Sequence, residues 1–346
     1  MPHAALLSIC LAQLGPNIRL DPRTNILLGV VLGVLLTGFF VGRALRRQPE
    51  STANPAVVRT FNLRIRAWLM LFSILIAGLM LGYVATVVLF GLISFWALRE
   101  FITMTPTRRG DHRTLFWTFV IFTPLQYVLV GLGLYEGFTV MIPVYASLFI
   151  PARIAVAGDP KRFLERVAKI QAGLLICVYC LSHAPAILGL SLTDAAKQPW
   201  VIGDVAANIR GSNASVLFFF VLMVQLNDVF QYMWSQLLGK HVIAPQINAS
   251  RTWEGLIGGT LSTMLAGMML SWATPFGLSW SGPIAGVVAL AGFAGSMTMS
   301  GIKRDRGVQD YGTLVSGHAG VLDRIDSLCF AAPVFFHITR FFFSAM

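Results

Sequence analysis

The chain alternates between long apolar stretches and short polar segments over most of its length. A helix needs about 20 apolar residues to cross the roughly 30 Å hydrocarbon core of a bilayer, and flanked helices need somewhat fewer. This pattern predicts ten membrane-spanning helices, over residues 24–42, 67–81, 84–101, 115–134, 137–152, 168–189, 213–237, 255–275, 281–301 and 325–344. The stretch 67–101 is too long for one span, which favours a tight turn at Gly82–Tyr83.

Basic residues are divided unevenly among the segments that connect these spans. Alternate segments share a side of the membrane, and one alternate set holds 21 of the 26 Lys and Arg residues. This set comprises residues 43–66, 99–114, 153–169, 238–254 and 302–324. Because cytoplasmic segments are enriched in Lys and Arg, we expect this set to face the cytoplasm, with both termini outside. We therefore expect a multi-pass protein of the inner (cytoplasmic) membrane.

The composition supports the same class. The 346 residues are 56% hydrophobic and only 12% charged, and the mean hydropathy is +0.71. A soluble fold would leave long apolar runs in water, at a cost of roughly 25 cal/mol per Å². The net charge of +11 then reports topology and is no argument for a nucleic-acid partner. The sequence predicts an all-α, polytopic integral membrane protein with about ten transmembrane helices.

Polar residues inside the spans are concentrated toward the C-terminus. We divide the chain into N-terminal transmembrane helices, residues 1–212 with about six spans, and a C-terminal region, residues 213–346, with two cytoplasmic motif loops. The span 213–237 carries Asp228, and an Asp inside a spanning helix costs about 2.5–3.5 kcal/mol on insertion scales. Such a residue normally faces a cavity, an ion or a partner. Asp228 is therefore either functional or the partner of an Arg at the helix end.

The two motif loops are the densest polar segments of the chain. The first contains Arg251-Thr252-Trp253-Glu254, and the second runs from Ser300 through Lys303, Arg304, Asp310, Gly317, His318 and Gly320 to Asp323, Arg324 and Asp326. Asp323 and Asp326 stand three residues apart at a helix start, so both carboxylates can point to one face. Carboxylates suit magnesium, and Lys and Arg neutralise phosphates. The residues alone leave two interpretations open: a site for a magnesium-bound polyphosphate, or two solvated basic loops.

Two smaller features have ordinary structural explanations. Cys177 and Cys180 form a C-x-x-C near His183, which could bind metal or cycle redox, but thiols are common small fillers in buried helices. Arg99 and Glu100, at the end of the third span, are expected to form a structural ion pair. Neither feature predicts chemistry.

The run from Ser300 to Asp326 resembles the signature of the phosphatidate cytidylyltransferase (CDP-diacylglycerol synthase) family. The matching positions are Ser300, Lys303, Arg304, Asp310, Gly317, His318, Gly320, Asp323, Arg324 and Asp326. An upstream block resembles the family's second conserved region, and it comprises Asp228, Tyr232, Gly239, Pro245, Arg251 to Gly255, and Gly258 with Gly259. Together the two blocks span residues 225–330, about a third of the chain.

The resemblance implies transfer of a cytidylyl group from CTP to phosphatidic acid, giving CDP-diacylglycerol and pyrophosphate in phospholipid biosynthesis. It implies Mg²⁺, with a second cation left open, a membrane lipid as partner, and no nucleic acid; a homodimer is also left open. The catalytic residues implied are Asp228, Lys303, His318, Asp323 and Asp326. Metal binding is implied for Asp228, Ser296, Asp323 and Asp326, and substrate binding for Arg251, Thr252, Trp253, Glu254, Ser300, Arg304, Asp310, Gly317, Gly320 and Arg324.

Two of these residues have more than one expected role. His318 has a suitable pKa for a general base, but a phosphate monoester needs little help to lose its proton, so we favour phosphate or loop hydrogen bonding. Trp253 could stack on cytosine, although Trp at a membrane interface is more often an anchor.

Four positions depart from the family pattern. Ser296 stands where an Asp is usual, Gln309 replaces Lys, Ser316 replaces Pro and Ala319 replaces Gly. The first change removes a metal carboxylate and the second removes a phosphate counter-charge, although the hydroxyl of Ser296 can ligate magnesium weakly. Catalysis remains the favoured hypothesis. The alternatives are a catalytically weakened homologue that binds nucleotide or lipid as a partner, and, less favoured, a transporter.

Overall fold

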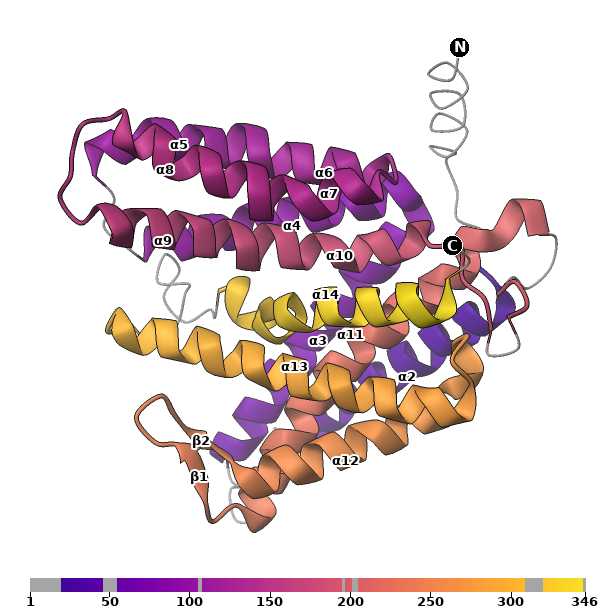
Figure 1. Cartoon of the computed structure of the whole chain (residues 1–346). Helices are drawn as coiled ribbons and strands as arrows, with labels where there is room; N and C mark the ends of the chain where they lie inside the picture. The colour runs from indigo at the N-terminus through magenta and orange to yellow at the C-terminus, as the bar shows by residue number, and fades with distance from the viewer. Residues whose placement is uncertain are drawn as a thin grey trace.

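The structure is a computed structural model that describes residues 20–45, 55–104, 108–194, 197–200, 205–308 and 320–344. The N-terminal helices are α2 (Pro22–Leu45), α3 (Pro55–Leu81), α4 (Tyr83–Thr103), α5 (His112–Phe116), α6 (Thr123–Gly131), α7 (Tyr135–Val140), α8 (Ser147–Ala155), α9 (Phe163–Gly173) and α10 (Leu181–Ala186). The C-terminal region comprises α11 (Val205–Leu238), a hairpin of β1 (Val242–Ala244) and β2 (Asn248–Thr252), α12 (Trp253–Met269), α13 (Gly277–Asp305) and α14 (Leu322–Phe343). Figure 1 shows these helices side by side in one bundle.

Three spans contain π-helical turns that join pairs of helices into continuous rods. Trp117–Phe122 joins α5 to α6, Met141–Ala146 joins α7 to α8, and Leu174–Cys180 joins α9 to α10. Pro143 lies in the second of these turns, and Pro124 lies two residues after the end of the first. Proline removes a helical hydrogen bond, and such local adjustments are tolerated in membrane helices because neighbouring groups satisfy the freed backbone.

The all-α membrane architecture expected from the sequence is confirmed. Each of the ten predicted spans falls on a helix, and eight helical segments of the described chain are long and apolar enough to cross a membrane. The remaining two are Trp68–Leu81, a shorter apolar helix, and α12, which has 17 residues. The predicted turn within 67–101 is also present. Gly82, with φ of 115°, separates α3 from α4, and a Cβ built on Gly78 would lie 2.8 Å from Leu89 of α4.

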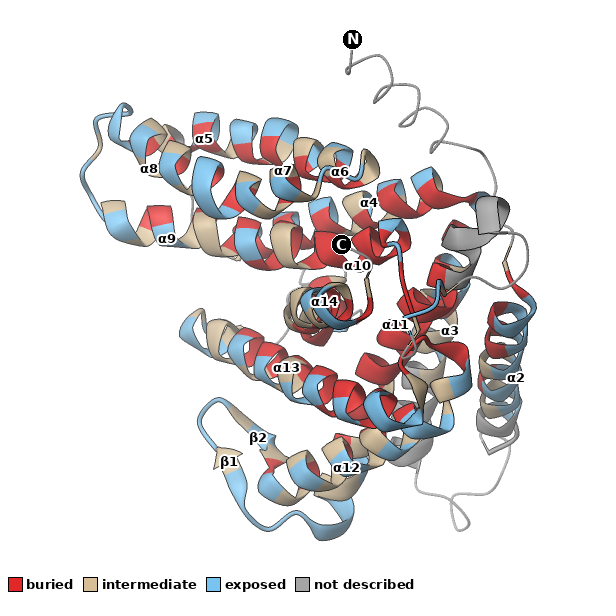
Figure 2. Cartoon of the chain, turned by 45° about the vertical axis from the view of Figure 1, so that its right-hand side comes forward, coloured by how far each residue is buried: buried red, intermediate tan, exposed pale blue. Residues whose placement is uncertain are grey.

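Helix α11 forms the centre of the C-terminal region. Its residues from Ala214 to Val224 are buried, which Figure 2 shows as a red stretch along the helix. It packs against α12, α13 and α14. Helix α14 also packs against α4 and α10, so the two regions distinguished in the sequence share a continuous core.

Segments with the most basic residues meet at one end of the bundle. Glu100, at the end of α4, accepts hydrogen bonds from the backbone amides of Val321 (3.1 Å) and Leu322 (2.8 Å) at the start of α14. Arg306, after α13, pairs with Glu165 of α9 at 3.5 Å. The expected pair of Arg99 with Glu100 is not formed between these two described residues, because Glu100 caps α14 and Arg99 lies over the ring of Trp96.

The opposite end of the bundle joins the other set of connections. The Nζ atom of Lys197 donates to the carbonyl of Phe342 at 2.8 Å, and Leu192 forms an antiparallel bridge with Ser344. Arg23 donates to the carbonyl of Trp272 at 3.3 Å. The grouping of segments into two alternate sets therefore agrees with the contacts, while the side that faces the cytoplasm stays a prediction.

Candidate active site

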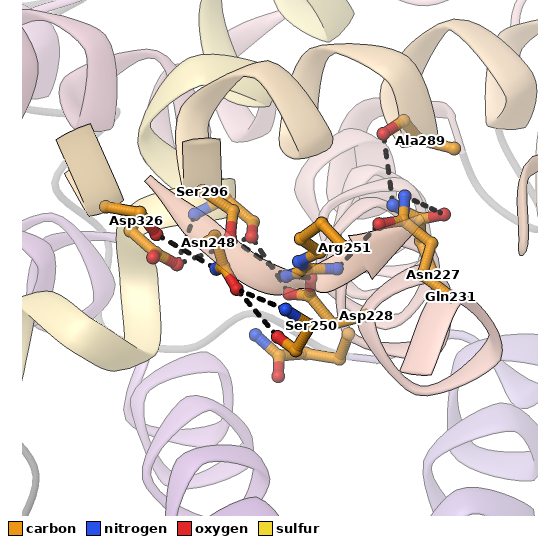
Figure 3. Close-up of polar contacts among 12 residues, drawn as sticks. Asn227, Asp228, Gln231, Asn248, Ser250, Arg251, Ala289, Ser296 and Asp326 are labelled. Atoms are coloured by element: carbon orange, nitrogen blue, oxygen red, sulfur yellow. Dashed lines mark hydrogen bonds and ion pairs between the residues drawn. The ribbon is translucent and has the colours of Figure 1, made fainter. Parts of the chain in front are cut away.

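Helices α3, α11, α13 and α14 and strand β2 surround a cavity of about 270 Å³ at the end with the basic segments. It is lined by Trp68, Leu71, Gln225, Asp228, Val229, Tyr232, Asn248, Ser250, Arg251, Ser296, Asp323, Arg324 and Asp326. Figure 3 shows the polar side chains of this lining converging from separate elements. Six of the residues predicted from the sequence line it, namely Asp228, Arg251, Ser296, Asp323, Arg324 and Asp326.

Arg251 connects three of the elements around the cavity. Its Nη2 atom donates to Oδ1 of Asp228 at 3.0 Å and to Oγ of Ser296 at 2.9 Å. Its Nη1 atom donates to Oε1 of Gln231 at 2.6 Å. A guanidinium offers several donors in a rigid plane, so one side chain holds α11 and α13 in a defined relation to β2 (Figure 3). Asp228, an acidic residue inside a membrane span, is therefore paired with an Arg, and it also lines the cavity.

Ser327 holds two carboxylates next to each other. Its hydroxyl donates to Oδ2 of Asp228 at 2.9 Å and lies 3.3 Å from Oδ1 of Asp326, which also accepts the Ser327 amide at 2.7 Å. Two carboxylates that share one small donor repel each other, and a cation between them relieves that repulsion. Mg²⁺ is commonly bound through one or two carboxylates together with substrate phosphates and water. Asp228 and Asp326 therefore fit a magnesium ion.

The other two predicted metal ligands have different partners. Asp323 accepts from Nζ of Lys303 at 2.8 Å and from the amide of Gly320 at 3.3 Å. Ser296 is engaged by Arg251, as described above. In the described part of the chain no group of three or more His, Cys, Asp or Glu side chains is arranged to hold a metal ion. The donor set here consists of one carboxylate pair.

The first motif loop is built by capping. The Oγ1 atom of Thr252 accepts the amide of Gly255 at 3.1 Å and starts α12. Glu254 accepts from Nδ1 of His241 at 2.6 Å and from the amides of Lys240 and His241. The hydrogen bond from His241 lowers the pKa of the Glu254 carboxyl to about 2. These contacts keep Thr252 and Glu254 out of the cavity lining, and Trp253 is half exposed on the bundle surface.

The basic part of the second motif loop is anchored through several contacts. Ser300 of α13 accepts from Nδ2 of Asn248 at 3.2 Å, and Nε of Arg304 donates to the carbonyl of Ile247 at 3.2 Å. These bonds tie the β hairpin to the end of α13. Arg324 is exposed and lines the cavity. Asp310, Gly317 and His318 lie outside the described residues, as do Gln309, Ser316 and Ala319.

Two glycines bring the backbones around the cavity into direct contact. A Cβ at Gly259 of α12 would lie 2.4 Å from Cγ and 2.8 Å from the amide nitrogen of Gln231. A Cβ at Gly295 of α13 would lie 2.8 Å from the carbonyl oxygen of Asp326. Any larger residue would push α11 from α12, or α13 from α14, and would displace the polar side chains between them.

Several residues at the site were not predicted as functional. Ser327 directly follows Asp326, and Gln231 lies one helical turn after Asp228, so both had a local indication in their polar character. Trp68 and Leu71 had none, because an apolar residue in an apolar helix is unremarkable in sequence. Their place in the lining depends on how α3 packs.

The fold and the site define a membrane-embedded protein with a polar, phosphate-compatible cavity at one end of its helices. The family model for the cytidylyltransferase family matches residues 62–342. The chain belongs to this family, as the run from Ser300 to Asp326 predicted, and the match reaches well beyond the third of the chain on which that prediction rested. We therefore regard it as a membrane nucleotidyltransferase.

Comparison with individual proteins gives two kinds of relative. The uncharacterized protein YnbB of Escherichia coli (strain K12) is 35% identical over 320 residues, which cover 91% of this chain and 97% of YnbB. The phosphatidate cytidylyltransferase of Staphylococcus haemolyticus (strain JCSC1435) is 32% identical over 127 residues, which cover 36% of this chain and 49% of that enzyme. The corresponding enzyme of Staphylococcus aureus (strain COL) is 33% identical over 129 residues, with the same coverage. The match to these two enzymes spans about half of their length.

Proposed function

We propose that the protein transfers the cytidylyl group of CTP to phosphatidic acid and forms CDP-diacylglycerol and pyrophosphate. The observation that carries this proposal is the convergence of Asp228, Asp326 and Arg251 on one cavity. Lys303 also lies close by, because it forms an ion pair with Asp323, which lines the same cavity. Carboxylate and cationic side chains from separate elements therefore meet in one small cavity. The relatives named phosphatidate cytidylyltransferase support the same substrates.

The reaction requires no side-chain nucleophile. A phosphate oxygen of phosphatidic acid attacks the α-phosphorus of CTP, the bond from the α-phosphorus to the bridging oxygen breaks, and pyrophosphate leaves. Catalysis of such a transfer consists mainly of positioning and charge neutralisation. Arg251, Lys303 and Arg324 are the cations available for the phosphates, and the acids that now bind Arg251 and Lys303 hold these side chains at the cavity before substrate arrives.

Magnesium would be held by Asp228 and Asp326. When bound, it would neutralise phosphate charge and orient the nucleotide. Ser296 has another role in this proposal, because its hydroxyl oxygen accepts a hydrogen bond from Arg251 at 2.9 Å. It orients the guanidinium toward the cavity. Ser296 therefore supplies no negative charge for a metal, and its role in this proposal is to hold the positive charge of Arg251 at the cavity.

The cavity has an apolar side that suits a lipid substrate. Trp68 and Leu71 of α3 and Val229 of α11 are apolar members of its lining. A phosphatidic acid molecule has the same division between a charged headgroup and apolar chains. We further propose that this end of the bundle faces the cytoplasm, where CTP is present, in accordance with the excess of Lys and Arg in its connecting segments.

The test is an assay of purified protein in detergent with labelled CTP, phosphatidic acid and Mg²⁺. We expect labelled lipid from the wild type and a loss of about 100-fold or more in Asp228→Asn, because that change weakens the carboxylate pair. The control is Asp305→Asn, which neutralises an exposed carboxylate at the end of α13 and should leave the rate unchanged. Wild-type protein that forms no labelled lipid above the Asp228→Asn level contradicts the proposal.

A second candidate rests on the Ser296 position. If the wild type binds CTP without turnover and Ser296→Asp gains turnover, the protein is a weakened homologue that acts by binding. The Arg251 contact argues for the active form, because it gives Ser296 a function within the site.

A further inference from the structure

A second and larger cavity lies at the other end of α14. Its volume is about 550 Å³, and it is lined by Tyr135, His337, Ile338, Arg340, Phe341, Phe342 and Ser344. It is formed where the start of α7 meets the last turns of α14, near the end of the chain marked C in Figure 1. Asp323 and Asp326 belong to the first turns of the same helix, so the two cavities are separated by most of the length of α14.

Two basic side chains, Arg340 and Lys197, are associated with this cavity. The guanidinium of Arg340 lies 3.4 Å from the centroid of the Tyr135 ring, and no acidic side chain in the described part of the chain pairs with it. The Nζ atom of Lys197 donates to the carbonyl of Phe342, one of the lining residues. Arg340 therefore lies in the wall of the cavity together with the imidazole of His337, and Lys197 is bound to the backbone of that wall.

The rest of the surroundings is apolar and accessible. Phe341 is 68% exposed and Phe342 is 42% exposed, and the ring of Trp280 lies 5.3 Å from that of Phe342. Tryptophan side chains such as that of Trp280 collect where helices leave the hydrocarbon core. A ligand that fits this place must combine an anionic group with apolar chains.

The distribution of charge along the sequence also draws attention to this end of the bundle. Only five Lys and Arg residues belong to the set of segments opposite the basic ones, and Lys197 and Arg340 are two of them. A basic residue on that side is unfavourable for topology, and Arg340 lies within an apolar helix, which adds an energetic cost. Arg340 lines the cavity, and Lys197 binds the carbonyl of Phe342, which also lines it.

We propose that this cavity binds an anionic phospholipid. The headgroup phosphate is bound by Arg340 and Lys197, and the acyl chains lie against Phe341 and Phe342. Arg is well suited to this role because its planar guanidinium can donate two hydrogen bonds to one phosphate while its face contacts Tyr135. The site is separate from the proposed transfer reaction, since it lies at the other end of α14.

Native mass spectrometry of the full chain in detergent tests this site by binding alone. The wild type is titrated with phosphatidylglycerol, with zwitterionic phosphatidylcholine and with inorganic phosphate. We expect bound phosphatidylglycerol, weaker phosphatidylcholine and no retained phosphate. Arg340→Gln should weaken phosphatidylglycerol binding about tenfold, whereas Arg340→Lys should retain most of it, because the charge remains.

Two further variants separate this site from the first cavity. Arg162→Gln makes the same change of charge at the other end of the bundle, and Lys303→Gln alters the first cavity. Both should bind phosphatidylglycerol as the wild type does. Equal binding by wild type and Arg340→Gln overturns the proposal, and phosphate that binds as well as the lipid overturns the assignment to a lipid. Because no turnover is measured, the result is independent of whether the chain transfers a cytidylyl group.

Discussion

The two ends of α14 show two ways of placing charge in a membrane helix. At its start, cations and acids are matched, since Arg251 binds Asp228 and Lys303 binds Asp323. At its end, Arg340 lies on an aromatic ring without an acidic partner among the described residues. A matched set keeps its geometry without ligand, and a substrate must exchange one set of ion pairs for another. The unmatched cation instead favours any anion that reaches it.

The sharpest test of this difference is Asp326→Asn. It removes one charge of the carboxylate pair beside Ser327. The rate of cytidylyl transfer should fall by about 100-fold or more, since removing one electrostatic group from an active site typically lowers the rate by that factor. The rate of lipid-linked cytidylate formation measures it, with Asp305→Asn, at an exposed position at the end of α13, as the control. An unchanged rate would show that the matched end has no catalytic role.

Arg251→Lys should have a smaller effect of about tenfold. Lysine keeps the charge but cannot contact Asp228, Ser296 and Gln231 together from a planar group. We expect kcat to fall more than KM rises, because the change disturbs orientation more than charge. Steady-state kinetics with CTP as the varied substrate distinguish the two, and a rise in KM alone would assign Arg251 to simple nucleotide binding.

Glu100→Gln tests how firmly the matched end is held in place. The carboxylate of Glu100 accepts two amide hydrogen bonds at the start of α14, and a neutral amide is a weaker acceptor. We expect a loss of about 1 kcal/mol in the free energy of unfolding, measured as a lower Tm in detergent. Glu136→Gln, at an exposed position, should leave Tm unchanged. Equal Tm values for the two variants would mean that the cap contributes nothing.

The smallest effect concerns the exposed contact of Glu254 with His241. The pKa of Glu254 is lowered from 4.5 to about 2, so the contact stabilises the fold above pH 4.5 and loses this contribution as the pH falls through about 2. The Tm difference between wild type and Glu254→Gln should shrink as the pH falls below 4, and added salt should reduce it. A difference that grows on acidification contradicts this assignment.

The sequence was sufficient for the helices and for the charged residues of the site. Apolar length placed each of the ten predicted spans on a helix, and the motif spacing identified Asp228, Arg251, Asp323 and Asp326, all of which line one cavity. These features are local, because a helix and a pair of residues three apart are determined by neighbouring positions.

Contacts between distant segments could not be predicted in the same way. Glu100 and Leu322 are separated by 222 residues, and no feature of either one points to the other. The contribution of α3 to the cavity wall was equally unpredictable, since Trp68 and Leu71 cannot be told from lipid-facing residues in the sequence. The short β hairpin also escaped prediction, because its strands have only three and five residues.

The close approach at Gly259 and Gly295 has a mechanical consequence. Backbone touches backbone at both places, so α11 with α12, and α13 with α14, behave as stiff pairs that cannot slide without steric overlap. Helix α3 reaches the same cavity through the side chains of Trp68 and Leu71, which can change rotamer at little cost. The α3 side is therefore the least constrained wall of the cavity, and α3 ends at Gly82, whose φ of 115° separates it from α4.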